Sequence, residues 1–160
     1  MHHLSKLKIF LVIPIFLFLV ACPVEKRQAL KSPAELMNLQ TKTFDVGKDT
    51  AMRAVVAVFQ DLGYIVQTTD NATGLITAKS PTEGNYNFFG RKMVDTRVTA
   101  TIEEIKKNST QVRLNFVTSK RLSFGYGMKQ ENETSIYDSN VYQDAFSKIR
   151  NAIFLRKNTS

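Results

Sequence analysis

The sequence contains very little histidine, cysteine or tryptophan. Its 160 residues include two histidines, one cysteine and no tryptophan. A single cysteine excludes an intramolecular disulfide. Both histidines, His2 and His3, stand at the N-terminal end, so a mature chain that loses this end has none. Ser-His-Asp and Cys-His catalysis and the usual histidine-containing metal sites are then excluded. We therefore expect no catalytic residues, no metal ligands and no cofactor.

Acidic residues are scarce relative to basic ones. The chain has 22 Lys and Arg against 14 Asp and Glu, a formal net charge of +8. The basic residues are spread along the chain, and we interpret them as a solvated basic surface, with attraction to lipid phosphate as the alternative. The content of 43% hydrophobic and 22% charged residues is typical of a globular protein. The length predicts one domain.

The long apolar run of this sequence lies close to its N-terminus. Residues 9–21 are all apolar and follow a short segment that carries Lys6 and Lys8 and no acidic residue. A basic start followed by about 7–15 apolar residues is typical of a secretory signal peptide, whereas a membrane span needs about 20. The sequence therefore predicts a signal peptide over residues 1–21.

The apolar run ends in Leu19-Val20-Ala21-Cys22, which resembles the lipobox of bacterial lipoproteins. The resemblance implies cleavage between Ala21 and Cys22 and acylation of Cys22, which anchors the chain in a membrane. Pro23 rather than Asp follows the cysteine, which favours the outer membrane in the enterobacterial sorting pattern. We expect a lipid-anchored envelope protein, facing the periplasm, that meets no nucleic acid. The alternative is an ordinary signal peptide followed by an unmodified cysteine.

The remaining chain divides into a tether and a single domain. Residues 22–40 are polar and predict a flexible tether with a short helical turn at 33–39, and residues 41–160 predict one α+β domain. Asp49 or Thr50 is expected to cap the first helix of the domain and Gly63 to end it. Periodicity predicts helices over 48–62 and 139–156 and strands over 41–46, 64–69, 75–79, 93–103 and 111–118.

The order of these elements, β-α-β-β-β-β-α, predicts the architecture. We expect an antiparallel sheet of about five strands packed against two helices, with the long C-terminal helix across its apolar face, a helix-grip-like arrangement. Residues 80–92 contain Pro and Gly and are predicted to be irregular. Residues 119–132 predict either a ragged edge strand or a long loop.

Residues 59–64 (Phe-Gln-Asp-Leu-Gly-Tyr), Asp70 and residues 74–76 (Gly-Leu-Ile) resemble the pattern of the NlpB/DapX-type lipoproteins, which are like component C of the barrel-assembly machinery. A group of uncharacterised short bacterial lipoproteins is similar as well. The resemblance covers residues 41–79 and, loosely, 137–155, and it implies a single helix-grip domain. Because this chain has one such domain rather than two, the resemblance does not extend to a barrel-assembly partner. The alternative is that the glycines only end a helix and form a hairpin turn, as they do in many unrelated α+β domains.

Two glycine-containing segments, around residues 86–89 and 124–128, combine aromatic side chains with methionine. We expect a candidate interaction patch there if these side chains are exposed together. The alternative is that both segments fold over the open end of the domain and complete its core. The candidate residues are Tyr86, Phe88, Phe89, Phe124, Tyr126 and Met128.

Two hypotheses for function follow from the sequence. The first is a non-catalytic outer-membrane lipoprotein that acts as a periplasmic adaptor or structural accessory in an envelope complex and binds an envelope protein. The second is a module that binds a lipid or another small apolar ligand in the groove between helix and sheet. A ligand cavity needs about 300 Å³ or more, and bulky inward residues such as Val98, Leu114 and Phe116 favour the first hypothesis.

Overall fold

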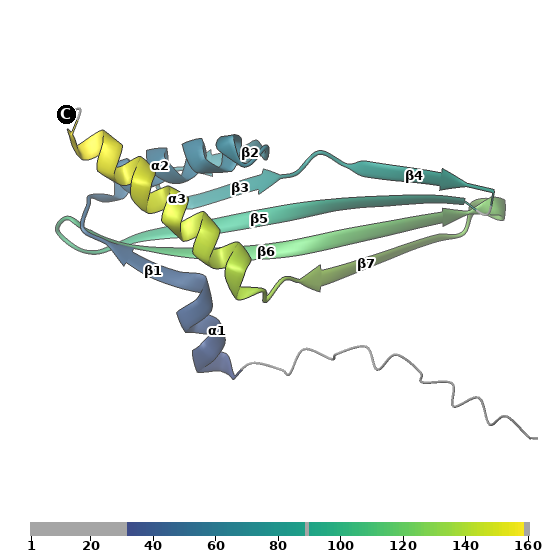
Figure 1. Cartoon of the computed structure of the whole chain (residues 1–160), viewed down its shortest axis with the longest axis horizontal. Coiled ribbons are helices and arrows are strands. Elements are labelled where there is room, and N and C mark those ends of the chain that lie inside the picture. Colours follow the sequence, from purple (N-terminus) through teal and green to yellow (C-terminus); the bar gives the residue numbers. More distant parts are fainter. Residues whose placement is uncertain (1–31, 89, 159–160) are drawn as a thin grey trace, which may run out of the picture. The chain divides into compact units, whose positions relative to one another are not determined.

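The computed structural model describes residues 32–88 and 90–158 (Figure 1). The predicted signal peptide, the lipidation site Cys22, the first part of the tether and the patch residue Phe89 lie outside the described residues. In chain order the elements are α1 (Pro33–Gln40), β1 (Thr41–Phe44), α2 (Lys48–Asp61), β2 (Ile65–Asp70), β3 (Leu75–Lys79), β4 (Glu83–Asn87), β5 (Gly90–Lys106), β6 (Ser109–Phe124), the 3₁₀ turn η1 (Gly125–Gly127), β7 (Lys129–Ser135) and α3 (Ser139–Asn158).

The described strands form one seven-stranded antiparallel sheet. Its order is β1-β6-β5-β3-β2, with β4 also paired to β5 and β7 also paired to β6. Because β5 and β6 have 17 and 16 residues, β3 and β4 follow one another along β5, and β1 and β7 lie along β6 (Figure 1). The sheet thus has a part covered by helices and a four-stranded extension, β4-β5-β6-β7. We call this extension the arm (residues 83–94 and 117–135).

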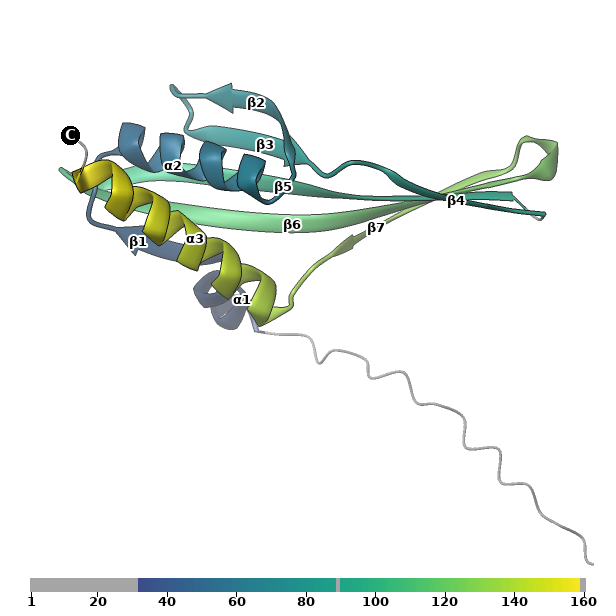
Figure 2. The same ribbon diagram turned by 45° about the horizontal axis from the view of Figure 1, so that its top comes forward.

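Helices α2 and α3 cover one face of the first part of the sheet (Figures 1 and 2). Alternate residues of the two long strands point toward them and are almost fully buried, as expected for a half-buried antiparallel strand. These findings confirm the predicted α+β class, the antiparallel sheet and the C-terminal helix across it. The central core residues, each at most 1% exposed, are Val55, Phe59, Val98, Ala100, Ile102, Val112, Leu114, Phe116, Tyr142 and Ile149. Among the described residues, no helix has the length and apolar character needed to cross a membrane.

Helix α2 ends at a glycine, as the sequence predicts. Gly63 has a φ of +80° and donates to the carbonyl of Gln60, while the next amide, of Tyr64, donates to the carbonyl of Phe59, both at 2.9 Å. This pair of bonds is a Schellman motif, which satisfies carbonyls that the helix end leaves open. The predicted cap at the other end is wrong. Gly47 is the N-cap residue without a side-chain bond, and Asp49 instead pairs with Arg53 along the helix at 2.5 Å.

The turn between β2 and β3 also lies where the sequence predicts it. The Asp70 carboxylate accepts hydrogen bonds from the Thr73 hydroxyl at 2.7 Å and from the Ala72 amide at 2.9 Å. These bonds, that of Thr73 first, lower the pKa of Asp70 below its ordinary value. Gly74 closes the turn at φ +74°, and its carbonyl accepts from the Ile102 amide at 2.8 Å, which ties the hairpin to β5.

The structure differs from the sequence-based expectation at residues 83–87 and 33–40, and for residues 119–132 it shows the strand rather than the loop. Residues 83–87, predicted to be irregular, form β4, and the uncertain segment 119–132 continues β6 and begins β7. The sheet therefore has seven strands rather than five. In addition, α1 belongs to the compact unit Lys31–Ser160 and packs at the sheet edge near β1, although residues 33–40 are assigned to the tether on sequence grounds. Ser32 and Glu35 form a capping box at its start.

Candidate functional site

The predicted patch residues that the structure describes gather at the free end of the arm. Gly90 pairs with Phe124 across β5 and β6, so the β4–β5 turn that holds Phe88 lies beside η1, which holds Tyr126 (Figure 1). We call the four described apolar side chains Tyr86, Phe88, Phe124 and Met128 the tip patch. The exposed fractions of these side chains are 67%, 99%, 44% and 68% in that order. They do not fold over the core, and all four are exposed at the surface.

Specific contacts shape this end of the arm. A side chain at Gly90 is excluded, because a Cβ there would lie 2.3 Å from the Ser123 carbonyl oxygen. The Arg91 guanidinium stacks over the Tyr86 ring, 4.8 Å from its centroid, a cation–π contact. The Phe124 amide donates to the Met128 carbonyl at 2.9 Å across η1. This end of the arm therefore carries exposed apolar side chains and, beside Tyr86, a cation held in place.

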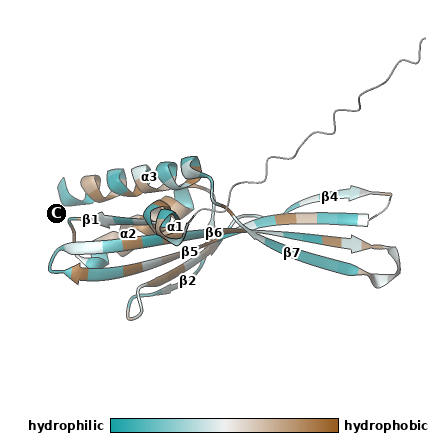
Figure 3. Cartoon of the chain, turned by 90° about the horizontal axis from the view of Figure 1, so that it is seen from below, coloured by the Kyte–Doolittle hydropathy of each residue, from teal (hydrophilic) through white to brown (hydrophobic). Residues whose placement is uncertain are grey.

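The base of the arm is tied together by charges on the sheet face opposite α2 and α3. The Asp95 side chain is 1% exposed and lies between Nη2 of Arg121, at 2.5 Å, and Nζ of Lys79, at 3.4 Å. Arg97 pairs with Glu133 at 3.5 Å. The Asp95 contacts join β3, β5 and β6, and the separate Arg97–Glu133 pair joins β5 to β7, so the polar arm has an ordered base. Figure 3 shows how hydrophilic β7 is along its length.

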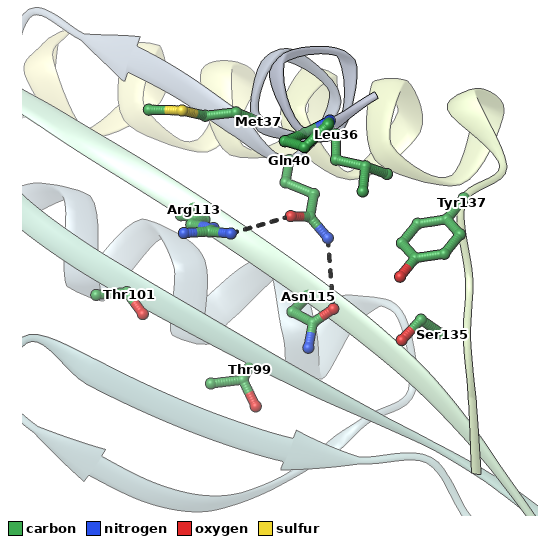
Figure 4. Close-up of a pocket in the computed structure, with 10 residues that line it drawn as sticks. Leu36, Met37, Gln40, Thr99, Thr101, Arg113, Asn115, Ser135 and Tyr137 are labelled. Atoms are coloured by element: carbon green, nitrogen blue, oxygen red, sulfur yellow. Dashed lines mark hydrogen bonds between the residues drawn. The ribbon is translucent and has the colours of Figure 1, made fainter. Parts of the chain in front are cut away.

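The second candidate site is a cavity of about 570 Å³ on the sheet face away from α2 and α3. Its floor is formed by β5 and β6, one wall by α1, and the opposite side by the segment that leaves β7 (Figure 4). We call it the α1 cavity. It is lined by Pro33, Leu36, Met37, Gln40, Thr99, Thr101, Arg113, Asn115, Ser135 and Tyr137.

Gln40, at the last position of α1, organises the α1 cavity. It is 6% exposed; its Oε1 accepts from Arg113 at 3.3 Å, and its Nε2 donates to Oδ1 of Asn115 at 3.5 Å (Figure 4). The same Nε2 lies 3.5 Å from the hydroxyl of Tyr142, which itself donates to the Ile136 carbonyl at 3.0 Å. One buried amide thus fixes two side chains of the cavity floor.

Sequence reasoning missed the α1 cavity. Gln40 is separated from Arg113 and Asn115 by 73 and 75 residues, and none of them belongs to a recognisable motif. Only the strand register β1–β6, which pairs Thr41 with Arg113, brings them together. In the described residues no group of three or more His, Cys, Asp or Glu side chains could hold a metal ion.

No family model matches the sequence, and no curated protein matches it. Several solved structures resemble the fold weakly, and two crystal structures are among them. A DUF4468 family protein from Bacteroides ovatus has a TM-score of 0.38 and 15% identity, covering 71% of this chain and 84% of that chain. A TBP-like protein from Parabacteroides distasonis has a TM-score of 0.35 and 13% identity, covering 69% and 91%. The resemblance to NlpB/DapX-type lipoproteins stays a prediction from sequence.

Proposed function

We propose that this chain is a non-catalytic lipoprotein of the bacterial outer membrane, facing the periplasm, that acts as an adaptor in an envelope complex. Acylated Cys22 holds it at the membrane, and the tip patch binds the partner protein. The observation that carries the proposal is the exposure of the tip patch, where Phe88 is 99% and Met128 is 68% exposed. Apolar side chains that cluster at the surface of a soluble domain mark interaction sites.

The arm supports this role because it presents the patch away from the core. Its base is held by the Asp95 network rather than by packing under helices, so the tip can enter a complex without disturbing the folded interior. Aromatic side chains and arginine are enriched in the energetically important centre of protein interfaces. The Tyr86–Arg91 pair supplies both.

A filled interior supports the adaptor over a carrier of apolar ligands. The side chains between the sheet and α3, including Leu114, Phe116 and Ile149, are at most 1% exposed. Phe116 also contacts the Tyr142 ring edge-on, with 5.2 Å between ring centroids. A carrier needs about 300 Å³ of open volume in this place, where this chain has packed aromatic and aliphatic groups.

The test compares assembly size in detergent extracts of the native bacterium. The wild-type chain is expected to sediment with a complex, whereas the double variant Phe88→Ser with Met128→Ser is expected to sediment alone. The matched control is Phe154→Ser, which removes an aromatic side chain that is 63% exposed on α3 and is expected to leave the complex intact. A double variant that sediments with the complex as the wild type does would contradict the proposal.

A further inference from the structure

The α1 cavity contains an arginine without an acidic partner. Arg113 forms no ion pair with any residue in the described part of the chain, and its guanidinium donates a hydrogen bond to the neutral side chain of Gln40. Among the described residues, none that lines the cavity carries a carboxylate. A guanidinium carries five N–H donors in a planar fork that matches a carboxylate or phosphate. The cavity therefore offers an unused site for a negatively charged group.

Four side chains with hydroxyl groups line the same cavity as this arginine. Thr99, Thr101, Ser135 and Tyr137 line the cavity, and across residues 32–88 and 90–158 none of their hydroxyls has a hydrogen-bond partner. A hydroxyl both donates and accepts. The lining thus suits a ligand whose own groups do both, as sugar hydroxyls do.

The amide of Asn115 adds an oriented donor. Its Oδ1 accepts from Gln40 at 3.5 Å, so its Nδ2 remains to donate to a ligand (Figure 4). Because Gln40 is itself buried and held beside Tyr142, this orientation is set before a ligand arrives. Fixing polar groups in advance lowers the entropic cost of binding.

Helix α1 supplies the apolar part of the cavity lining. Leu36 and Met37 line the cavity beside Pro33, and Met37 is 58% exposed. An apolar wall opposite a polar floor fits the two sides of a sugar ring, whose C–H groups and hydroxyls point in different directions. The volume of about 570 Å³ lies within the range of about 300–1,000 Å³ that ligand sites occupy.

We infer that the α1 cavity binds an oligosaccharide that carries a carboxylate, with Arg113 on the carboxylate and the floor residues on the sugar hydroxyls. Among the described residues that line the cavity, Arg113 is the one with a charge. A singly charged carboxylate balances that charge, whereas a doubly charged phosphate would keep an excess negative charge. This binding is independent of the partner that docks at the tip patch, since the two sites share no residue.

The experiment is calorimetric titration of the full chain in detergent with two probes, a galacturonic acid tetramer and a hyaluronate tetramer. Saturable binding of at least one of them is expected. Full methyl esterification of the bound probe is expected to weaken binding at least about tenfold, because it removes the charge and keeps the hydroxyls. Arg113→Gln is expected to weaken binding of the acidic probe by a similar factor, and Asn115→Ala several-fold.

Arg97→Gln is the matched control, because Arg97 lies on the same sheet face, pairs with Glu133 and does not line the cavity. It is expected to bind the probe as the wild type does. The inference is overturned if neither tetramer binds at concentrations up to about 10 mM. It is equally overturned if Arg113→Gln binds as tightly as the wild type, or if a glutamate tetrapeptide or the methyl ester binds as tightly as the acidic sugar.

Discussion

The buried carboxylate of Asp95 accepts a hydrogen bond from Nη2 of Arg121 at 2.5 Å, and this contact joins β5 to β6 at the base of the arm. Lys79 reaches the other oxygen of the same carboxylate from β3, at 3.4 Å. One acidic group thus links three strands where the helices no longer cover the sheet. The backbone ladder of β5 and β6 continues past this link to Gly90 and Phe124 at the tip.

Removing the Asp95 carboxylate is expected to loosen the arm. Asp95→Ala leaves Arg121 and Lys79 without their buried partner, which costs about 1–3 kcal/mol in free energy of unfolding. Hydrogen exchange is expected to accelerate most in β5 and β6 around Asp95 and Arg121, where the link is lost. Asp49→Ala is the control, because its ion pair with Arg53 is 64% exposed on both sides, and such pairs contribute about 0.3–0.5 kcal/mol. Equal effects of the two variants would contradict the role given to Asp95.

Gly74 is expected to tolerate no side chain. Its φ is +74°, and a Cβ there would lie 2.0 Å from the Ile102 carbonyl oxygen. Gly74→Ala should therefore lower the free energy of unfolding by at least about 2 kcal/mol, measured by urea denaturation. Gly125→Ala is the comparison, since nothing lies within 4 Å of a Cβ at that position. If the two substitutions cost the same, the hairpin is not pressed against β5 as described.

The carboxylate of Asp70, in the turn between β2 and β3, is expected to make the free energy of unfolding depend on pH. Its pKa is lowered in the folded chain, first by the Thr73 hydroxyl. The contribution of Asp70 to the free energy of unfolding is therefore complete above its pKa in the unfolded chain, about 3.9. This contribution is lost as the pH falls through the lower pKa of the folded chain. The difference in unfolding free energy between wild type and Asp70→Ala should shrink in this interval. Thr73→Val should raise the pKa of Asp70, measured by NMR titration. Parallel loss of stability in wild type and Asp70→Ala would refute this assignment.

The tip patch and the core are expected to differ sharply in their effect on stability. Phe88→Ser should change the free energy of unfolding by no more than about 0.5 kcal/mol, because the side chain is 99% exposed. Phe116→Ala should cost about 3–5 kcal/mol, because that ring is 1% exposed. Thermal unfolding of the two variants checks both values. A large loss for Phe88→Ser would mean that the tip is a structural element.

The sequence predicts those elements of the fold whose formation depends on residues close to one another in the chain. Gly63, Gly74 and the alternation of Val98, Ala100 and Ile102 act through neighbouring residues, and each lies where it was expected. Strands β4 and β7 gave no such signal, because sequences such as Lys-Gln-Glu-Asn-Glu lack apolar alternation. They are strands because β5 and β6 offer unpaired edges beside them.

The same distinction applies to the sites. The aromatic character of both tip segments is visible in the sequence, but their adjacency follows from the register that pairs Gly90 with Phe124. Alternation assigns Asp95 to the outward face of β5, which is correct, yet its burial among basic side chains depends on β3 and β6. The α1 cavity rests on contacts across more than 70 residues, which no local pattern encodes.

Photo-crosslinking in the native bacterium tests the adaptor role most directly, with a photoreactive residue placed in turn at Phe88, Phe124 and Phe146. The first two positions are exposed at the tip, and the third lies on the buried side of α3, where Phe146 is 3% exposed and its ring lies 6.4 Å from that of Phe44. The account predicts adducts of one defined protein mass from both tip positions and none from Phe146. Adducts of lipid mass from Phe146, without protein adducts from the tip, would contradict it and identify the chain as a carrier.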